Sequence, residues 1–352
     1  MDEETGAAFS RRMLEVLTGS AVSMLVSVGH RTGLFEAAAD GPASSGELAE
    51  RAGLQERYVR EWLGAMVTCG FFDYDAASGR YALPAARAAS LTGDRAGNMA
   101  PMASTLRALA GALPDLEHCL RVGGGLPRSE FAPHFAAAGA DAGDSWRRVY
   151  DEHLVTGFIG AVDGLAARLT AGARVLDLGC GLGHAVNVLA GAFPKSWFVG
   201  VDIDRRAIEL AEAERAALGL HNASFEVADA AQVLPGSPFD VITAFDAVHD
   251  QHSPGLVLRG VHAALPPRGM FLMVDANFSS YLENNIGNPF APLCYAISLL
   301  YCTPVSLADG GAGLGAMWGT ELACQMLSEA GFTDVTVLDS PRPQNCIYVC
   351  RP

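Results

Sequence analysis

The sequence has few positive charges for its length. It holds 24 lysine and arginine residues against 39 aspartate and glutamate residues, a formal net charge of -15 over 352 residues. A chain with this balance repels the phosphates of nucleic acids and anionic membrane surfaces. We therefore expect neither nucleic acid nor a membrane surface as its main partner.

Cysteine pairs and a leader segment are also missing. The eight cysteines are scattered and form no C-x-x-C pair. The first residues do not combine a basic segment with a following apolar run, as a secretory signal does. These features predict a reduced protein located in the cytoplasm.

The longest stretch without charged residues covers residues 284–308. Its length alone would permit a membrane span. Asparagines and prolines interrupt it, however, and their polar groups would stay unpaired in lipid. We expect a buried helix between Pro292 and Pro304 instead.

The length favours two domains, and the first, residues 1–92, is predicted to be mainly helical. Apolar residues recur at helical spacing over residues 9–39. A capping-type serine, Ser44, then begins one short helix, and a second helix covers residues 58–68. Two short strands follow, residues 71–74 and 80–83. This order predicts a helix-turn-helix with a wing.

The second of these helices could contact DNA, so its charge matters. Arg57 and Arg60 are offset by Glu56 and Glu61, which leaves the helix face nearly neutral. Phosphate contacts dominate such affinity, so the pattern favours a dimerisation or substrate-capping role over DNA binding.

The second half of the chain is expected to be an α/β domain. Residues 93–145, rich in alanine, glycine and proline, are predicted to form a helical linker region. A helical pattern begins at Trp146, and strands alternate with helices from Arg174 onward. Such alternation is typical of a doubly wound parallel sheet, here assigned to residues 146–352.

An apolar run ending in an acid and three alternating glycines covers residues 174–183. Asp177, Gly179, Gly181 and Gly183 give the spacing G-x-G-x-G, and His184 stands where a dinucleotide-binding loop has its last glycine. The stretch resembles motif I of the class I S-adenosylmethionine-dependent methyltransferases. The resemblance implies a seven-stranded Rossmann-like sheet and S-adenosylmethionine as cofactor.

Two later strands also end in acids. Asp202 follows nineteen residues after Gly183, close to the spacing of an acid that binds both ribose hydroxyls. Asp229 ends the third strand, where the resembling family contacts the adenine amino group. The alternative is that each acid only ends its strand. Cys180 is expected to contact the cofactor rather than to act as a nucleophile, and the remaining expected cofactor contacts are Ile203, Ala230 and Phe245.

The fourth strand, residues 239–246, leads into a His-Asp pair, His249 and Asp250. The order of this pair, a following helix and a Pro-Gly turn resembles small-molecule O-methyltransferases, in which the histidine is the general base. Histidine suits the task because its ordinary pKa of about 6.5 lets it take a phenol proton near neutral pH. The residues after the pair, Gln251 to Ser253, depart from that family.

The same loop also allows a metal site. His249 and His252 with Asp246 or Asp250 offer ligands, but the motif is short and has no second cluster. We therefore predict no metal.

An insertion at about residues 277–319 is longer than the usual connection in such sheets. It would either cover the substrate as a lid or extend the core. With the winged helix, it resembles a bacterial group of winged-helix methyltransferases. The candidate substrate contacts are His153, Asn277, Tyr281 and Trp318, although His153 also suits an ordinary polar helix face.

These patterns predict methyl transfer from S-adenosylmethionine to a small-molecule acceptor, with a hydroxyl favoured and His249 as the base. The apolar helical N-terminal region predicts a homodimer. The alternatives are an N-, S- or C-methyltransferase on the same fold and a metabolite-sensing regulator.

Overall fold

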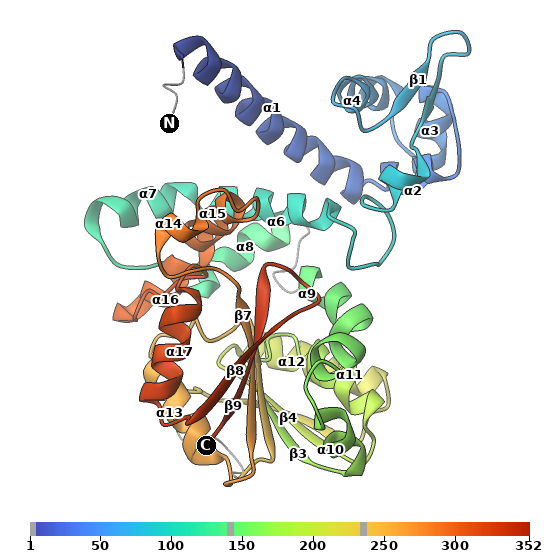
Figure 1. The fold of residues 1–352 in the computed structure, drawn as a ribbon. Coiled ribbons are helices and arrows are strands. Elements are labelled where there is room, and N and C mark those ends of the chain that lie inside the picture. The colour runs from blue at the N-terminus through green and yellow to red at the C-terminus, as the bar shows by residue number, and fades with distance from the viewer. Residues whose placement is uncertain (1–4, 139–143, 233–237) are drawn as a thin grey trace. The chain divides into compact units, whose positions relative to one another are not determined.

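The computed structural model describes residues 5–138, 144–232 and 238–352 (Figure 1). The chain divides into two compact units. One comprises residues 1–111 and 133–148, and the other comprises residues 112–132 and 149–352. The region expected to link two domains is thus shared between them.

The first unit contains the predicted helix-turn-helix and wing. Ser44 caps α3 through a capping box with Glu47, as the sequence suggested. The wing strands β1 and β2 pair antiparallel, and Trp62 of α4 packs edge-on against Phe35 and Phe72. The elements are α1 (Gly6–Arg31), α2 (Leu34–Ala39), α3 (Ser45–Ala52), α4 (Glu56–Thr68), β1 (Asp73–Asp75), β2 (Arg80–Ala82), α5 (Ala85–Ala88) and α6 (Ala100–Gly111).

Helix α1 is the long apolar element of this unit. Among the described residues it is the one helix whose length and composition would allow it to cross a membrane, and little of its apolar stretch is buried. Its exposed apolar side chains include Phe9, Leu14, Leu17 and Met24. Exposed apolar surface of this extent is uncommon on a single folded chain.

Residues 93–145, the expected linker region, are mainly helical where the structure describes them. Some of their helices belong to the first unit and others to the second. Helices α7 (Leu113–Val122) and the start of α8 (Arg128–Ala138) belong to the second unit, whereas α6 belongs to the first. The assignment changes at Pro133, inside α8. Helix α9 (Asp144–Val149) precedes a π-helix, η1 (Tyr150–Ile159).

The second unit is built on the predicted seven-stranded sheet, in the order β5-β4-β3-β6-β7-β9-β8. The first five strands of that order are parallel, and β9 pairs antiparallel with both β7 and β8. Central strands such as β6 and β7 are buried along their whole length, as strands covered on both faces must be. The strands are β3 (Arg174–Leu178), β4 (Trp197–Asp202), β5 (Ala223–Val227), β6 (Val241–Phe245), β7 (Met270–Ala276), β8 (Asp334–Asp339) and β9 (Asn345–Arg351).

Helices cover both faces of this sheet (Figure 1). Helices α10, α11 and α12 lie on one face, and α13 and α17 lie on the other. The crossovers between parallel strands require this arrangement, and it places the glycine loop at the carboxyl edge of the sheet. The helices are α10 (Leu165–Ala171), α11 (His184–Ala192), α12 (Arg205–Ala217), α13 (Pro254–Ala264) and α17 (Gly319–Glu329).

The insertion after β7 is mostly helical. The residues between Pro292 and Pro304 are helical, and a π-helical segment, η2, lies among them. Single π-helical segments inside helices are frequent at functional sites. The elements are α14 (Leu282–Asn285), α15 (Ala291–Ile297), η2 (Ser298–Cys302), α16 (Thr303–Leu307) and the 3-10 turn η3 (Ala308–Gly310).

Candidate active site

The glycine loop follows β3 at the centre of the sheet. Gly181 has φ 52° and open space where a side chain would lie, whereas a Cβ at Gly183 would lie 2.5 Å from Ala211 and Phe225. The first glycine leaves room for a ligand, and the second allows the loop to pack against α12 and β5. The loop therefore forms a cradle that fits a cofactor.

Asp202 is buried at the end of β4, beside this cradle. Its Oδ2 accepts a hydrogen bond from the Gly181 backbone N at 2.8 Å, and its Oδ1 accepts one from the Asp204 N at 2.9 Å. Each carboxylate oxygen keeps a second lone pair. The Asp202 side chain thus orders the loop and still offers acceptors to a ribose.

Asp177 is buried at the end of β3 and accepts a hydrogen bond from Thr243 Oγ1 at 2.6 Å. Burial raises the pKa of Asp177 to about 7, although the Thr243 bond lowers it. A cation bound nearby would favour the ionised carboxylate. S-adenosylmethionine, the cofactor expected from the sequence, carries positive charges on its sulfonium and amino groups.

The other predicted cofactor residues surround the same edge. Ile203 follows Asp202 and is 71% exposed, which leaves an apolar side chain free for a flat ring. Asp229 accepts from the Ala231 N at 2.9 Å and from Gln232 Nε2 at 3.2 Å. Ala230 and Phe245 are buried, and Cys180 is half-buried, with burial raising the pKa of its thiol well above its usual value. A raised pKa disfavours the thiolate, which is the nucleophilic form of a cysteine.

His184 holds the start of α11. Its Nε2 lies 2.7 Å from Asp151 Oδ1 in η1, and its Nδ1 lies 3.0 Å from Glu214 Oε1 in α12. His184, which stands where a dinucleotide-binding loop has its last glycine, thus connects α11, η1 and α12. The sequence pattern singled out this residue but did not predict the two carboxylates that it contacts.

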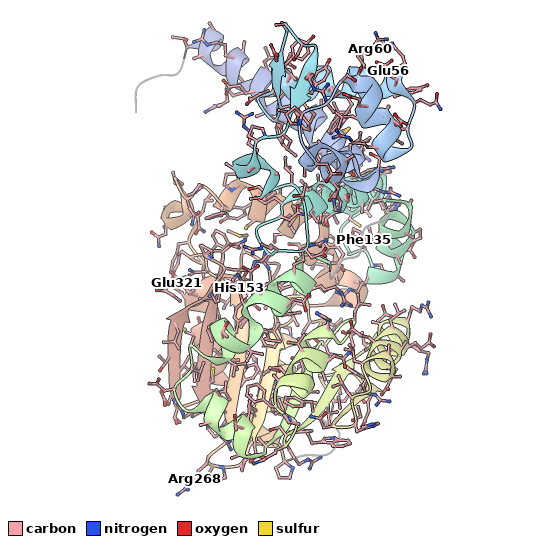
Figure 2. The ribbon with its side chains drawn as sticks, turned by 90° about the vertical axis from the view of Figure 1, so that its right-hand side faces the viewer. Glu56, Arg60, Phe135, His153, Arg268 and Glu321 are labelled. Atoms are coloured by element: carbon pink, nitrogen blue, oxygen red, sulfur yellow. The ribbon has the colours of Figure 1, made fainter. Side chains whose placement is uncertain are left out.

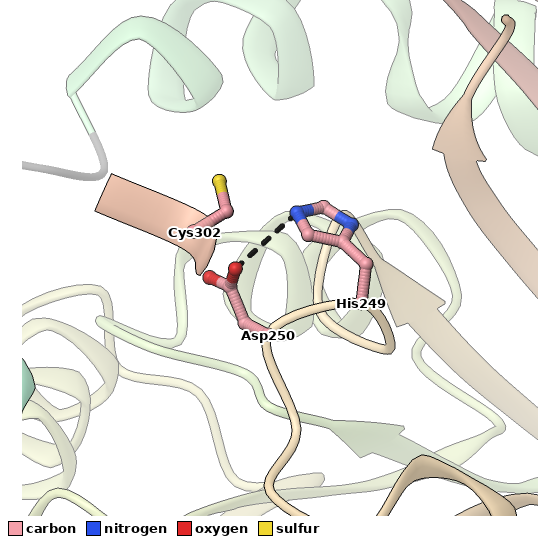
Figure 3. A group of neighbouring side chains, drawn as sticks. All are labelled: His249, Asp250 and Cys302. Carbon is pink, nitrogen blue, oxygen red and sulfur yellow. Dashed lines mark ion pairs between the residues drawn. The ribbon is translucent and has the colours of Figure 1, made fainter. Parts of the chain in front are cut away.

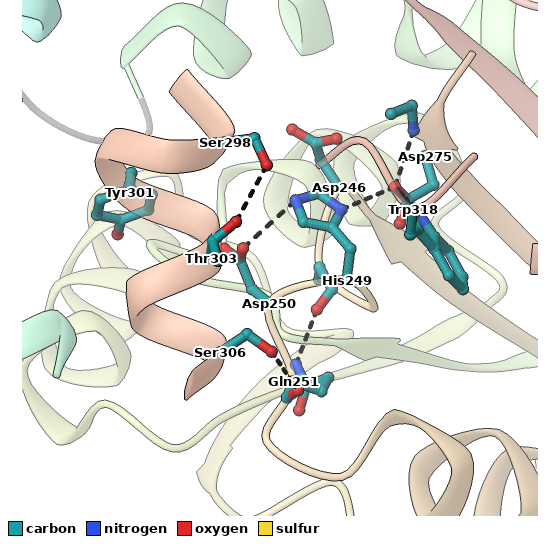
Figure 4. Close-up of polar contacts among 12 residues, drawn as sticks. Asp246, His249, Asp250, Gln251, Asp275, Ser298, Tyr301, Thr303, Ser306 and Trp318 are labelled. Atoms are coloured by element: carbon teal, nitrogen blue, oxygen red, sulfur yellow. Dashed lines mark hydrogen bonds and ion pairs between the residues drawn. The ribbon is translucent and has the colours of Figure 1, made fainter. Parts of the chain in front are cut away.

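His249 is 1% exposed and lies after β6 in a polar network (Figure 4). Its Nδ1 lies 2.7 Å from Asp275 Oδ1 at the end of β7, and its Nε2 lies 3.3 Å from Asp250 Oδ1. Asp275 also accepts from Trp318 Nε1 at 3.0 Å and from the Ala276 N at 2.8 Å. Because Asp275 is held from two further sides, it holds the imidazole ring in one orientation.

Two opposing effects act on the pKa of His249. Burial lowers it, but the carboxylates of Asp275 and Asp250 outweigh burial and raise the pKa well above its ordinary value. The imidazolium formed by proton uptake is therefore stabilised. Asp246, at the end of β6, has φ 54°, a strained conformation for a residue with a side chain and one that clusters at active sites.

The insertion contributes side chains to the same region. Cys302, at the end of η2, lies beside Asp250 and the Nε2 edge of His249 (Figure 3). Ser306 of α16 donates to the Gln251 backbone O at 3.1 Å, which ties the insertion to the loop after β6. Arg128 donates from Nε to Tyr301 Oη at 2.9 Å. Part of the insertion thus contacts the loop that carries His249.

The four candidate substrate residues have different surroundings. His153 is half-buried on η1 (Figure 2), and Asn277 donates to the Pro343 O at 3.2 Å. Tyr281 is exposed at the start of α14. Trp318 is 3% exposed and holds Asp275, so its contacts are those of a positioning residue.

Sequence reasoning missed two of the groups around His249. Asp275 ends the fifth strand, so the strand-end acids that pointed to Asp202 and Asp229 could also have identified it. No local signal pointed to Cys302, which lies in an apolar helix and reaches His249 only through the fold.

Two family profiles match the chain. Residues 20–93 match the Rv2258c-like winged HTH domain, and residues 169–300 match a methyltransferase domain family. The second match contains the glycine loop, Asp202, Asp229 and His249, which are the residues assembled above.

Individual proteins show the same similarity. Trans-aconitate 2-methyltransferase from Methylobacterium nodulans is 40% identical over 76 residues, which are 22% of this chain and 28% of that protein. The mitomycin 7-O-methyltransferase MmcR has a structure similar over 98% of both chains, with a TM-score of 0.70 and 20% identity. Human N-acetylserotonin methyltransferase in complex with S-adenosylmethionine matches over 100% of this chain and 99% of its own, with a TM-score of 0.71 and 17% identity. The chain therefore consists of a winged helix-turn-helix domain followed by a methyltransferase domain, the domain type that uses S-adenosylmethionine.

Proposed function

We propose that the protein transfers the methyl group of S-adenosylmethionine to a hydroxyl of a small, partly apolar molecule, with His249 as the general base. The observation that carries the proposal is the chain of contacts from Trp318 through Asp275 to His249 Nδ1. It leaves Nε2 as the ring nitrogen that takes the proton. The O-methyltransferases with the same fold support a hydroxyl acceptor.

The roles of the residues follow from their contacts. The cofactor supplies a methyl group on a sulfonium, which makes the reaction an in-line displacement that depends on positioning. The glycine loop and Asp202 would hold the donor. His249 would take the hydroxyl proton, and Asp275 would stabilise the resulting imidazolium, much as a buried aspartate does in a hydrolase triad. The helices of the insertion would exclude water.

A labelling experiment tests this function. The purified protein is incubated with a metabolite extract and S-adenosylmethionine carrying a labelled methyl group, and the products are separated by mass spectrometry. We expect one class of hydroxyl compound to gain the label on oxygen. Label on nitrogen, sulfur or carbon would show that the acceptor is not a hydroxyl. If S-adenosylmethionine binds but no product gains label, a metabolite sensor would be favoured.

The raised pKa of Asp177 predicts a pH-dependent donor affinity. Below about pH 7 the carboxyl holds a proton that a bound cation would displace, so affinity should rise with pH and level off above the pKa of about 7. Between pH 6 and pH 8 the ionised fraction of such a group rises about tenfold, and the affinity for S-adenosylmethionine should follow. Calorimetric titration over this range measures it. Asp177→Asn should flatten the profile, and an equally steep profile in that variant would refute the assignment.

The winged helix is proposed to bind no nucleic acid. On α4, Arg60 Nε lies 3.4 Å from Glu56 Oε1 (Figure 2), and Arg57 pairs with Glu61. Each arginine of this helix thus has a carboxylate beside it, which reduces its attraction for phosphate. Tight, salt-sensitive binding to duplex DNA in a shift assay would favour the regulatory alternative.

Helix α1 is proposed to join two copies of the chain in a homodimer. Leu14 and Leu17 are 65% and 61% exposed. Arg11, Arg12 and Glu15 lie in the same helix, and their charges disfavour its insertion into a membrane. We expect Leu14→Glu with Leu17→Glu to convert a dimer into a folded monomer in light scattering. The assignment would be contradicted if the wild-type protein were a monomer. It would also be contradicted if the wild-type protein sedimented with lipid vesicles and the double substitution abolished this binding.

A further inference from the structure

In place of the sequence-based expectation of no metal, we propose that His249, Asp250 and Cys302 form a binding site for a zinc-type divalent cation. Their side chains offer an imidazole nitrogen, a carboxylate oxygen and a sulfur atom, all within 4.8 Å of one another (Figure 3). Two of these residues are buried, and Asp250 is half-buried. Nitrogen, oxygen and sulfur are the three ligand types that zinc accepts in proteins.

The spacing of the first two ligands fits a tetrahedral ion. His249 Nε2 and Asp250 Oδ1 are 3.3 Å apart, and Asp250 Oδ1 has no hydrogen-bond partner among the described residues although it is shielded from solvent. Zinc bonds of about 2.0–2.2 Å at tetrahedral angles separate two ligand atoms by about 3.3–3.6 Å. The pair therefore has the separation that a shared cation requires. A buried carboxylate oxygen without a hydrogen-bond donor also gains from such a cation.

The surroundings of His249 match those of a metal-binding histidine. Such histidines commonly bond their second ring nitrogen to a carboxylate, which fixes the tautomer and the ring orientation. Here His249 Nδ1 faces Asp275 at 2.7 Å, and Trp318 holds Asp275 in turn. With Nδ1 facing Asp275, the other ring nitrogen, Nε2, faces Asp250, and Cys302 lies beside this pair (Figure 3).

The charges also balance. Binding releases the thiol proton of Cys302 to solvent, together with any proton on Nε2, because metal ligands must be deprotonated. One thiolate and one carboxylate then neutralise the two charges of the ion, and the histidine adds a neutral ligand. Three protein ligands leave a fourth position for water or another oxygen ligand.

Metal binding would compete with methyl transfer, a consequence that rests on the proposed function. The base needs the lone pair of His249 Nε2, and the ion would occupy it. Because Cys302 belongs to the insertion and Asp250 to the loop after β6, the ion would also join these two segments.

The experiment uses the full-length protein after treatment with a chelator. Zn²⁺ is titrated against a chromophoric chelator, and Co²⁺ is used as a spectroscopic probe because cobalt bound to a thiolate absorbs in the near ultraviolet. We expect one ion per chain, with a dissociation constant on the order of 1 µM or tighter. Cys302→Ser should remove the thiolate absorption and weaken zinc binding by about 100-fold or more.

Two further variants make the result decisive. Cys69→Ser removes an exposed thiol in the other unit and should change nothing. Asp250→Asn keeps the shape of the side chain and should weaken binding even if Cys302→Ser fails to fold. Absence of binding, or a loss caused by Cys69→Ser instead, would overturn the proposal.

Binding is measured without substrate, so its outcome is separate from that of the proposed function. If the protein transfers methyl groups but binds no zinc, the proposed metal site is refuted and the proposed function stands. Zinc binding by a protein that transfers no methyl group would leave the site in place and remove the proposed function.

Discussion

Replacing His249 with alanine should lower kcat by about 10²- to 10⁴-fold, the range that a general base contributes. Affinity for S-adenosylmethionine should not change, because the cradle is built from Asp202 and the glycine loop. His249 is buried, and its Nδ1 is held by Asp275 Oδ1 at 2.7 Å. Steady-state methylation of the identified acceptor and calorimetric titration of the donor measure the two quantities.

The neighbouring histidine provides the matched control. His252 is exposed three residues further along the same loop, and its Nδ1 lies 2.9 Å from Ser253 Oγ. His252→Ala should keep kcat within about twofold, since surface substitutions commonly have small effects. All rates are measured with a chelator present, so that bound metal does not occupy His249. Equal rates for His249→Ala and the wild type would remove this residue from the mechanism.

Trp318 shows why the supporting residues could not be predicted. The substrate hypothesis treated it as an aromatic side chain of a lid, yet its indole donates to Asp275, 43 residues earlier in the chain. Asp275 in turn reaches His249, 26 residues before it. The contact between His249 and Asp275 exists because the ends of β6 and β7 are neighbours in the sheet, and Trp318 reaches Asp275 from the start of α17. Local sequence patterns carry no information on such pairs.

The fold and the cofactor cradle could be predicted because their signals are local. The apolar run of β3, its terminal acid and the alternating glycines form one continuous stretch, and left-handed backbone at Gly179, Gly181 and Gly183 explains why glycine is required there. Residues 93–145 gave weaker signals. Their composition indicated helices, but the division between the two compact units depends on contacts with distant elements.

Asp202→Ala should weaken S-adenosylmethionine binding by about 100-fold, the second large effect we expect. The substitution removes the acceptor for two backbone N–H groups, those of Gly181 and Asp204, at 2.8 and 2.9 Å. Hydrogen bonds to a charged group contribute about 1.5–3 kcal/mol each, and a buried donor without an acceptor costs a similar amount. Part of the lost free energy comes from the glycine loop becoming less ordered, and part comes from the lost contact with the ribose. Calorimetric titration of the donor and of its demethylated product measures the change.

Asp204, two residues further on, separates the binding role from a structural one. It caps α12 by accepting from the backbone N of Arg206 at 2.8 Å and of Ala207 at 3.3 Å, and its side chain has no bond to the glycine loop among the described residues. Asp204→Ala should cost about 1 kcal/mol of stability, as loss of a helix cap does, while leaving donor affinity nearly unchanged. If both variants lost affinity equally, the effect of Asp202 would come from the stability of this region rather than from its carboxylate. A loss of affinity in Asp202→Ala alone, at equal thermal stability of the two variants, would show that the carboxylate itself serves the donor site.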